Sequence, residues 1–184
     1  PPLLDEMKSG INIVKDLPKA PIRTFEGYRN PNGGFAGTRN ILGISTTVQC
    51  VSGVLNVAVK RMKEKLLPKY PNVDDIVPIN HAYGCGVAIN APDAVIPIRS
   101  LKNISKHPNF GGELMVVALG CEKLTVEMLV DEADIKPENV IILQELAGFN
   151  AMIDKLMEVS EIKLKRLNER KREILPLSDL LIGM

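Results

Sequence analysis

The sequence ILGISTTV (residues 41–48) is a short apolar run, and a longer segment with apolar residues at helical spacing follows it at 51–67. The first pattern predicts a strand and the second a helix. The same order returns with an apolar run at 76–80 and a helical pattern at 91–105. Alternation of this kind is typical of βα units arranged around a parallel sheet.

Further apolar runs extend the pattern. Residues 114–119, 140–143 and 180–182 predict three more strands. Residues 147–175 are longer and more charged, and they predict a helix with a solvated face. We therefore expect an α/β domain over residues 39–184, built as a Rossmann-like three-layer unit with a mostly parallel sheet.

The first part of the chain has a different composition. Residues 1–38 are rich in Pro and Gly and show weak periodicity, so they predict a linker and a looped segment. Within it, Asn32-Gly33 is a strong turn signal, because both residues tolerate positive φ, and it predicts a tight turn or short hairpin. The run at 180–182 ends without a following turn or helix, so we expect this chain to be a fragment of a longer multidomain protein.

Composition excludes several classes of function. The chain has 184 residues, 45% of them apolar and 24% charged, as in an ordinary soluble domain. A net charge of +1 and only 4% aromatic residues disfavour a nucleic-acid partner. No apolar run reaches about 18 residues and no signal-peptide pattern opens the chain, so we expect no membrane association and a cytoplasmic location. Three widely spaced cysteines argue for reduced thiols rather than a disulfide framework.

The three cysteines follow three of the predicted strands. Cys50 comes just after the first strand, Cys85 a few residues after the second and Cys121 directly after the third. Ligands bind at the carboxyl edge of open α/β sheets, where the loops converge. We expect these thiols to meet there and to bind a soft metal site of iron, an iron–sulfur cluster or zinc. The alternative is that each cysteine is a small buried apolar residue.

The segment HAYGCG (residues 81–86) concentrates reactive groups in the loop after the second predicted strand. His81 could ligate a metal or move a proton near neutral pH. Tyr83, Gly84 and Gly86 are assigned to substrate binding, since glycines let backbone N–H groups approach an anion closely. The alternative for His81 is a histidine that only makes hydrogen bonds within its loop.

Two polar pairs complete the candidate site. Arg39 can clamp a carboxylate with two hydrogen bonds, and we assign it with Asn40 to substrate binding. A structural salt bridge explains Arg39 equally well. Glu122 and Lys123 place an acid and a base beside the third cysteine, where either could transfer a proton. No Gly-x-Gly-x-x-Gly follows any predicted strand, so no nicotinamide cofactor is expected.

At these residues the sequence resembles the galactarate and altronate dehydratase family. The resemblance runs from Thr24 to about Leu129. It is carried by FEGYR (25–29), GTRN (37–40), TTVQC (46–50), HAYGCG (81–86) and GCEK (120–123). Two more stretches resemble the galactarate branch in particular: LPKYPNV (67–73) and NFGGE (109–113).

The resemblance implies an iron-dependent loss of water from a sugar acid, which converts galactarate to 5-dehydro-4-deoxy-glucarate. It implies Fe²⁺ or an iron–sulfur cluster near Cys50, Cys85 and Cys121, with proton transfer by His81 and by the Glu122–Lys123 pair.

Members of this family are longer, with a small domain before this region and a large one after it. The resemblance therefore implies that these flanking domains are partners and that the isolated fragment is inactive; a homo-oligomer remains open. The alternatives are altronate or another sugar acid as substrate, or a noncatalytic α/β scaffold that docks the catalytic parts.

Overall fold

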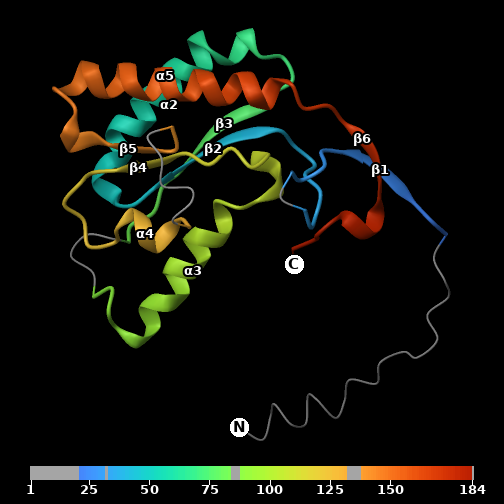
Figure 1. The fold of residues 1–184 in the computed structure, drawn as a ribbon, viewed down its shortest axis with the longest axis horizontal. Coiled ribbons are helices and arrows are strands. Elements are labelled where there is room, and N and C mark those ends of the chain that lie inside the picture. Colours follow the sequence, from blue (N-terminus) through green and yellow to red (C-terminus); the bar gives the residue numbers. More distant parts are fainter. Residues whose placement is uncertain (1–20, 32, 84–87, 132–137, 184) are drawn as a thin grey trace, which may run out of the picture.

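A computed structural model describes residues 21–183 except residues 32, 84–87 and 132–137, and Figure 1 shows its fold. The strands and helices alternate along most of the chain, as the sequence predicts. In chain order they are β1 Thr24–Gly27, β2 Ile41–Thr46, α2 Ser52–Lys65, β3 Asp75–Ile79, α3 Val95–Ile104, β4 Val116–Ala118, α4 Val126–Leu129, β5 Val140–Ile142, α5 Phe149–Asn168 and β6 Glu173–Pro176.

The main sheet is parallel and has the strand order β3-β2-β4-β5. Ile41 of β2 pairs with Asp75 of β3, and Thr46 pairs with Val117 of β4. A helix lies between each consecutive pair of these strands in the chain, as parallel pairing requires. The predicted α/β class is therefore confirmed, and the order is compatible with a Rossmann-like arrangement.

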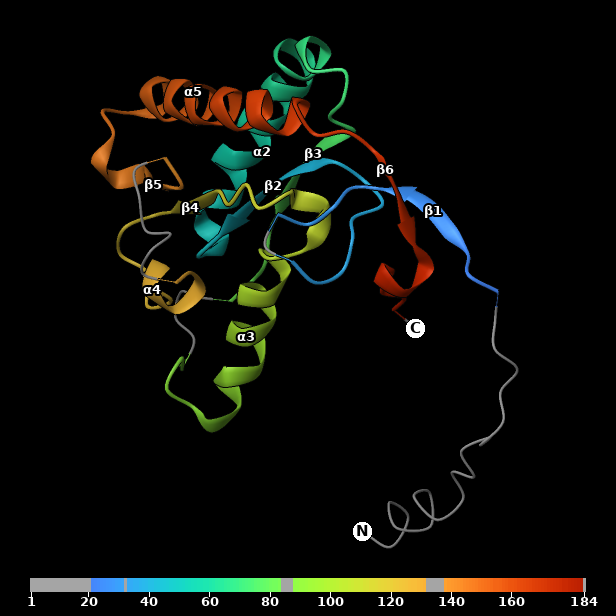
Figure 2. The same cartoon turned by 45° about the vertical axis from the view of Figure 1, so that its right-hand side comes forward.

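Helices cover both faces of the main sheet. Helices α2 and α5 lie on one face, and α3 and α4 lie on the other (Figures 1 and 2). In β4 the buried side chains alternate between two apolar clusters, with Val117 packed toward α2 and α5 and Val116 toward α3 and α4. Burial on both faces explains why these strands are continuous apolar runs. The expected three layers are present.

A second, smaller sheet joins the beginning and end of the described chain. Strand β1 pairs with β6 in antiparallel orientation, with Thr24 opposite Pro176. The sequence predicted a looped segment where β1 lies and a helix over the first residues of β6. Both strands have four residues, too few to show a clear period of two.

Two features near the chain ends were predicted differently. The predicted helix ends at Asn168 rather than at residue 175, and the predicted strand at 180–182 is wrong. Leu181 and Ile182 are 67% and 75% exposed, and no strand lies beside them among the described residues.

The predicted turn is confirmed, because Gly33 N–H donates to Asn30 O at 3.0 Å. Asn32 itself is outside the described residues.

Asn40 anchors the amino end of β2 to the rest of the domain. Its backbone N–H donates to Asp74 Oδ2 at 2.7 Å, and its side-chain amide donates to the carbonyl oxygens of Asn72 and Leu167, both at 2.8 Å. Arg170 Nη1 donates to Asn40 Oδ1 at 2.8 Å. The fully buried Asn40 therefore connects β2, the loop before β3 and the end of α5.

A buried lysine ties α5 to the amino ends of β4 and β5. Lys163 Nζ donates to Asn139 Oδ1 at 2.9 Å and lies 3.3 Å from Glu113 Oε2. Burial lowers the pKa of Lys163, although the Glu113 carboxylate opposes that effect. The ammonium group is thus partnered on both sides, as a buried charge must be.

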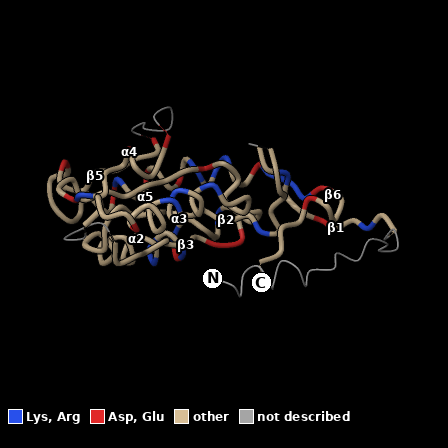
Figure 3. Tube along the Cα trace, turned by 90° about the horizontal axis from the view of Figure 1, so that it is seen from below, with Lys and Arg blue, Asp and Glu red and all other residues tan. Residues whose placement is uncertain are grey.

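Charges are distributed evenly over the molecule. Figure 3 shows Lys and Arg interspersed with Asp and Glu along the coloured part of the trace, which covers the described residues. None of the helices in the described ranges is long and apolar enough to cross a membrane.

Gly43 gives a test of the packing between β2 and the α3 face. A Cβ added to Gly43 would lie 2.7 Å from Cε1 of the Phe110 ring, whereas one added to Gly53 in α2 would meet nothing within 4 Å. We expect Gly43→Ala to lower the free energy of unfolding by about 1–3 kcal/mol through overpacking. The matched variant Gly53→Ala should be neutral or stabilising by up to about 1 kcal/mol. Urea denaturation followed by circular dichroism measures both, and equal midpoints would contradict this packing.

Asn40 and its neighbour Arg39 make a second test. Asn40→Ala leaves several buried partners unpaired, so we expect a loss of about 3 kcal/mol in the free energy of unfolding. Arg39→Ala removes only an ion pair whose arginine side chain is 54% exposed, so we expect a loss below about 1 kcal/mol. Thermal and urea melts of the two variants provide the comparison. A larger loss for Arg39→Ala than for Asn40→Ala would show that the anchor is misassigned.

Candidate functional site at the carboxyl edge

The chain order places a switch point between β2 and β4. From β2 the chain crosses to β3 on one side, and then returns to β4 on the other side of β2. Loops that leave the two halves of such a sheet in opposite directions open a crevice at the carboxyl ends of the central strands. The segments after β2, β3 and β4 lead into this region, and they carry the predicted cysteines.

A carboxylate bridges the ends of β2 and β4. The hydroxyl of Thr47, which is fully buried, donates to Glu122 Oε1. The same carboxylate accepts the backbone N–H of Leu119 at 3.0 Å and that of Gly120 at 2.6 Å. Gly120 has a φ of 117°, a conformation that favours glycine. Glu122 is therefore held by donors from two segments that are far apart in the sequence.

These donors stabilise the ionised form of Glu122. Partial burial by itself raises its pKa, but the hydrogen bonds from the Thr47 hydroxyl and from nearby backbone N–H groups outweigh burial, and the pKa is lowered. The side chain is thus a fixed carboxylate at neutral pH. Its weak basicity fits a fixed anion better than a group that exchanges protons near neutral pH. Proton transfer by Glu122 stays a prediction.

His81 ties the loop after β3 to the same end of β2. Its Nε2 lies 2.7 Å from the Thr46 carbonyl oxygen, and its Nδ1 accepts the Tyr83 N–H at 3.1 Å. The tautomer that matches both contacts donates from Nε2 and accepts at Nδ1. Both ring nitrogens are therefore occupied, so metal ligation or proton uptake at Nδ1 requires the bond from Tyr83 to break.

Two of the three predicted thiols are exposed near the ends of β2 and β4. Cys50 lies in the short 3-10 helix Gln49–Val51 after β2, and Cys121 lies after β4, where Gln144 Nε2 donates to its sulfur at 3.4 Å. The alternative of small buried apolar residues is therefore wrong for these two. Lys123 is also exposed.

Several predicted residues fall outside the described chain. Gly84, Cys85 and Gly86 are among them, so the expected meeting of three thiols stays a prediction. Within the described ranges, no three or more His, Cys, Asp or Glu side chains form a group that could hold a metal ion. Tyr83 packs against the α3–α4 cluster and lies near the described end of this loop.

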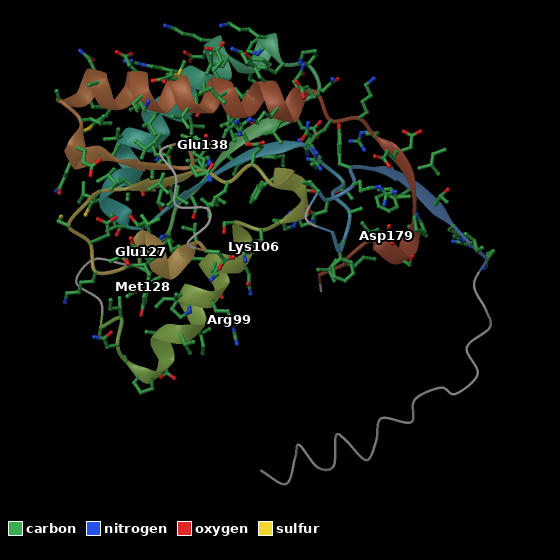
Figure 4. All side chains as sticks on the ribbon, viewed as in Figure 1. Arg99, Lys106, Glu127, Met128, Glu138 and Asp179 are labelled. Atoms are coloured by element: carbon green, nitrogen blue, oxygen red, sulfur yellow. The ribbon has the colours of Figure 1, made fainter. Side chains whose placement is uncertain are left out.

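A small cavity lies beside Glu122. Its volume is about 210 Å³, and α4 contributes Glu127, which Figure 4 labels. The lining residues are Ala118, Gly120, Glu122, Thr125, Val126, Glu127 and Ile142. A larger cavity of about 540 Å³ lies elsewhere, between the end of α3 and the end of α4, with Lys106 and Asp131 in its wall. The smaller cavity is lined by the end of β4 and its following loop, by α4 and by β5, and it includes the Glu122 carboxylate that bonds to Thr47.

Arg39 and Asn40 lie at the opposite edge of the sheet. They precede β2, whose length of six residues corresponds to roughly 20 Å. Arg39 Nε pairs with Asp74 Oδ2 at 3.4 Å, and the Asn40 amide is fully used in anchoring the strand. The described chain therefore does not bring these two residues to the thiols. Their role in substrate binding stays a prediction.

Sequence reasoning missed Thr46 and Thr47 as individual site residues, although both belong to the TTVQC stretch. Their position at the end of an apolar strand was a usable signal for the carboxyl edge. Their partners were not predictable, because Glu122 follows Thr47 by 75 residues. The hydrogen bond from Gln144 to Cys121 likewise depends on β5 lying beside β4.

Comparison with known proteins identifies the family. Residues 27–168 match the family described as D-galactarate dehydratase/Altronate hydrolase, second domain. Galactarate dehydratase (L-threo-forming) of Escherichia coli (strain K12) is 47% identical over an alignment that covers 100% of this chain and 36% of the relative. Altronate dehydratase of Bacillus subtilis (strain 168) is 34% identical, with 88% of this chain and 32% of the relative covered.

Altronate dehydratase of Escherichia coli (strain K12) is 32% identical, with 92% of this chain and 34% of the relative covered. The chain thus spans about a third of the length of these relatives. The match over residues 27–168 includes the whole main sheet and the candidate site. The chain therefore belongs to the D-galactarate dehydratase/altronate hydrolase family and contains its second domain.

Proposed function

We propose that this chain is the second domain of a sugar-acid dehydratase that acts on galactarate in the cytoplasm. The family match carries the proposal, and galactarate is chosen because the galactarate dehydratase is 47% identical whereas the two altronate dehydratases are 34% and 32% identical. In the reaction a proton leaves the carbon beside a carboxylate and the β-hydroxyl leaves as water. The resulting enol becomes the 2-keto-3-deoxy acid 5-dehydro-4-deoxy-glucarate.

Iron fits the donor set at the carboxyl edge. Cys50 and Cys121 are exposed thiols beyond the ends of neighbouring strands, and soft thiolates suit iron. We assign both to iron, together with Cys85, as Fe²⁺ or a cluster. Iron bound there would supply Lewis acidity, which stabilises the negative charge that develops during loss of water.

The protein side chains have separate tasks in this proposal. Lys123 is exposed beside Cys121, and its ammonium group can donate a proton to the departing hydroxyl. His81 can take up a proton at Nδ1 once Tyr83 N–H moves away. Arg39 remains a candidate for binding a substrate carboxylate from the opposite edge of the sheet.

A noncatalytic scaffold is the second candidate. It is favoured by the internal hydrogen bonds that use both nitrogens of His81 and both oxygens of Glu122. On that reading the chain orders the neighbouring parts of a longer enzyme and binds no iron.

Metal analysis separates the two candidates. We expect the chain, prepared without oxygen in the presence of Fe²⁺, to retain stoichiometric iron after desalting, as measured by mass spectrometry of the metal. Cys50→Ser and Cys121→Ser should each lose most of it, because a serine hydroxyl is a harder and weaker ligand for this site. Met128→Leu, which changes an exposed sulfur on α4, is the matched control and should retain iron. Equal iron in all four proteins, or none in any, would contradict the thiol site.

The isolated chain should not dehydrate galactarate, because it covers only 36% of the length of the relative that is named galactarate dehydratase. Incubation with galactarate and iron, followed by chromatographic detection of the 2-keto-3-deoxy acid, tests this. Product formation by this chain alone would show that the second domain holds a complete active site.

A further inference from the structure

We propose that Thr47 and Glu122 are positioning residues, whose hydrogen bond sets the separation between the thiols of Cys50 and Cys121. This positioning role does not depend on a bound substrate. Its importance for catalysis rests on the proposed function, in which the two thiols hold iron.

The two cysteines follow neighbouring strands at equivalent distances along the chain. Thr46 of β2 pairs with Val117 of β4, Cys50 lies four residues beyond Thr46, and Cys121 lies four residues beyond Val117. Neighbouring strands are about 4.8 Å apart. The segments that follow β2 and β4 therefore leave the sheet side by side. The separation of the two thiols then depends on the path of each segment beyond its strand.

Backbone pairing reaches the last residue before those segments. Thr47 N–H donates to Val117 O at 3.1 Å, which continues the ladder by one residue beyond β2. Beyond this backbone bond, the Thr47 side chain connects the two segments, because its hydroxyl donates to the carboxylate of Glu122. The bond thus joins a position three residues before Cys50 to the residue directly after Cys121.

Both segments are firmly held on their own side of this bond. Val48 and Val51 flank the Cys50 turn and are fully buried, so the turn is fixed against the core. On the other segment, the N–H groups of Leu119 and Gly120 hold the Glu122 carboxylate. Loss of the bond between the segments therefore leaves the Cys50 turn fixed on the core and lets the segment that carries Cys121 move relative to it.

The chain contains a matched control. Thr125 also forms a hydrogen bond with a glutamate, Glu127, but both residues belong to the single segment around α4. Thr125→Val therefore removes a bond of the same chemical type that does not connect the two cysteine-bearing segments.

Crosslinking measures the separation directly. In a Cys85→Ser background, Cys50 and Cys121 are the only thiols of the chain. A short bifunctional methanethiosulfonate should join them within one molecule, as read by intact mass. Thr47→Val and Glu122→Gln should slow the crosslinking about tenfold, the size expected when a hydrogen bond to a charged group is removed. Thr47→Ser, which keeps the hydroxyl, and Thr125→Val should crosslink at the parent rate.

Crosslinking rates are compared only among variants that unfold cooperatively, as followed by circular dichroism. In each of these variants, Cys50 and Cys121 must also react with a monofunctional thiol reagent at the parent rate. Should Glu122→Gln fail to fold, Glu122→Asp replaces it, since it keeps the charge but shortens the reach. A parent protein that does not crosslink, or Thr47→Val crosslinking at the parent rate, overturns the positioning role.

A Cd²⁺ titration separates this inference from the proposed function. In the protein with all three cysteines, we expect an ultraviolet thiolate-to-metal absorption band that weakens in Thr47→Val and is retained in Thr47→Ser and Thr125→Val. A parent protein that crosslinks but gives no band contradicts the metal site while the positioning role stands. A band of equal strength and affinity in parent and Thr47→Val overturns the positioning role.

Discussion

The hydrogen bonding of strand β2 is the constraint on which the rest of the structure depends. It pairs with β3 on one side and with β4 on the other, and polar residues anchor both of its ends. Asn40 joins its amino end to α5, and Thr46 and Thr47 join its carboxyl end to the loops after β3 and β4. The loops after β3 and β4, which carry predicted site residues, are thus both hydrogen-bonded to the end of this strand.

Much of this arrangement was predictable from local sequence, because a strand buried on both faces must be apolar and a parallel strand must be followed by a crossover. The patterns at residues 41–48 and 51–67 therefore predicted β2 and α2. The pair of β1 and β6 was not predictable, because its residues lie more than 140 positions apart and each strand is short. Residues 180–182 show the opposite error, in which an apolar run has no neighbouring strand to supply hydrogen bonds.

The candidate site shows the same division. Residues placed by the ends of strands, such as Cys50 and Cys121, could be assigned to the carboxyl edge from spacing alone. Arg39 was assigned to the same site, but it precedes β2 and therefore lies at the amino edge of the sheet. The restraint of Glu122 by Thr47 depends on the neighbour relationship of β2 and β4, which adjacent residues do not reveal.

The antiparallel pairing of β1 and β6 has a mechanical consequence. Thr24 and Pro176 are opposite one another, so tension on the chain before the first and after the second would load the same end of the hydrogen-bonded ladder. A ladder loaded in this way opens one rung at a time, whereas a ladder pulled lengthwise must break all its rungs together. The small sheet would therefore yield first under force and lengthen the chain, while the parallel sheet and the cavity beside Glu122 kept their shape.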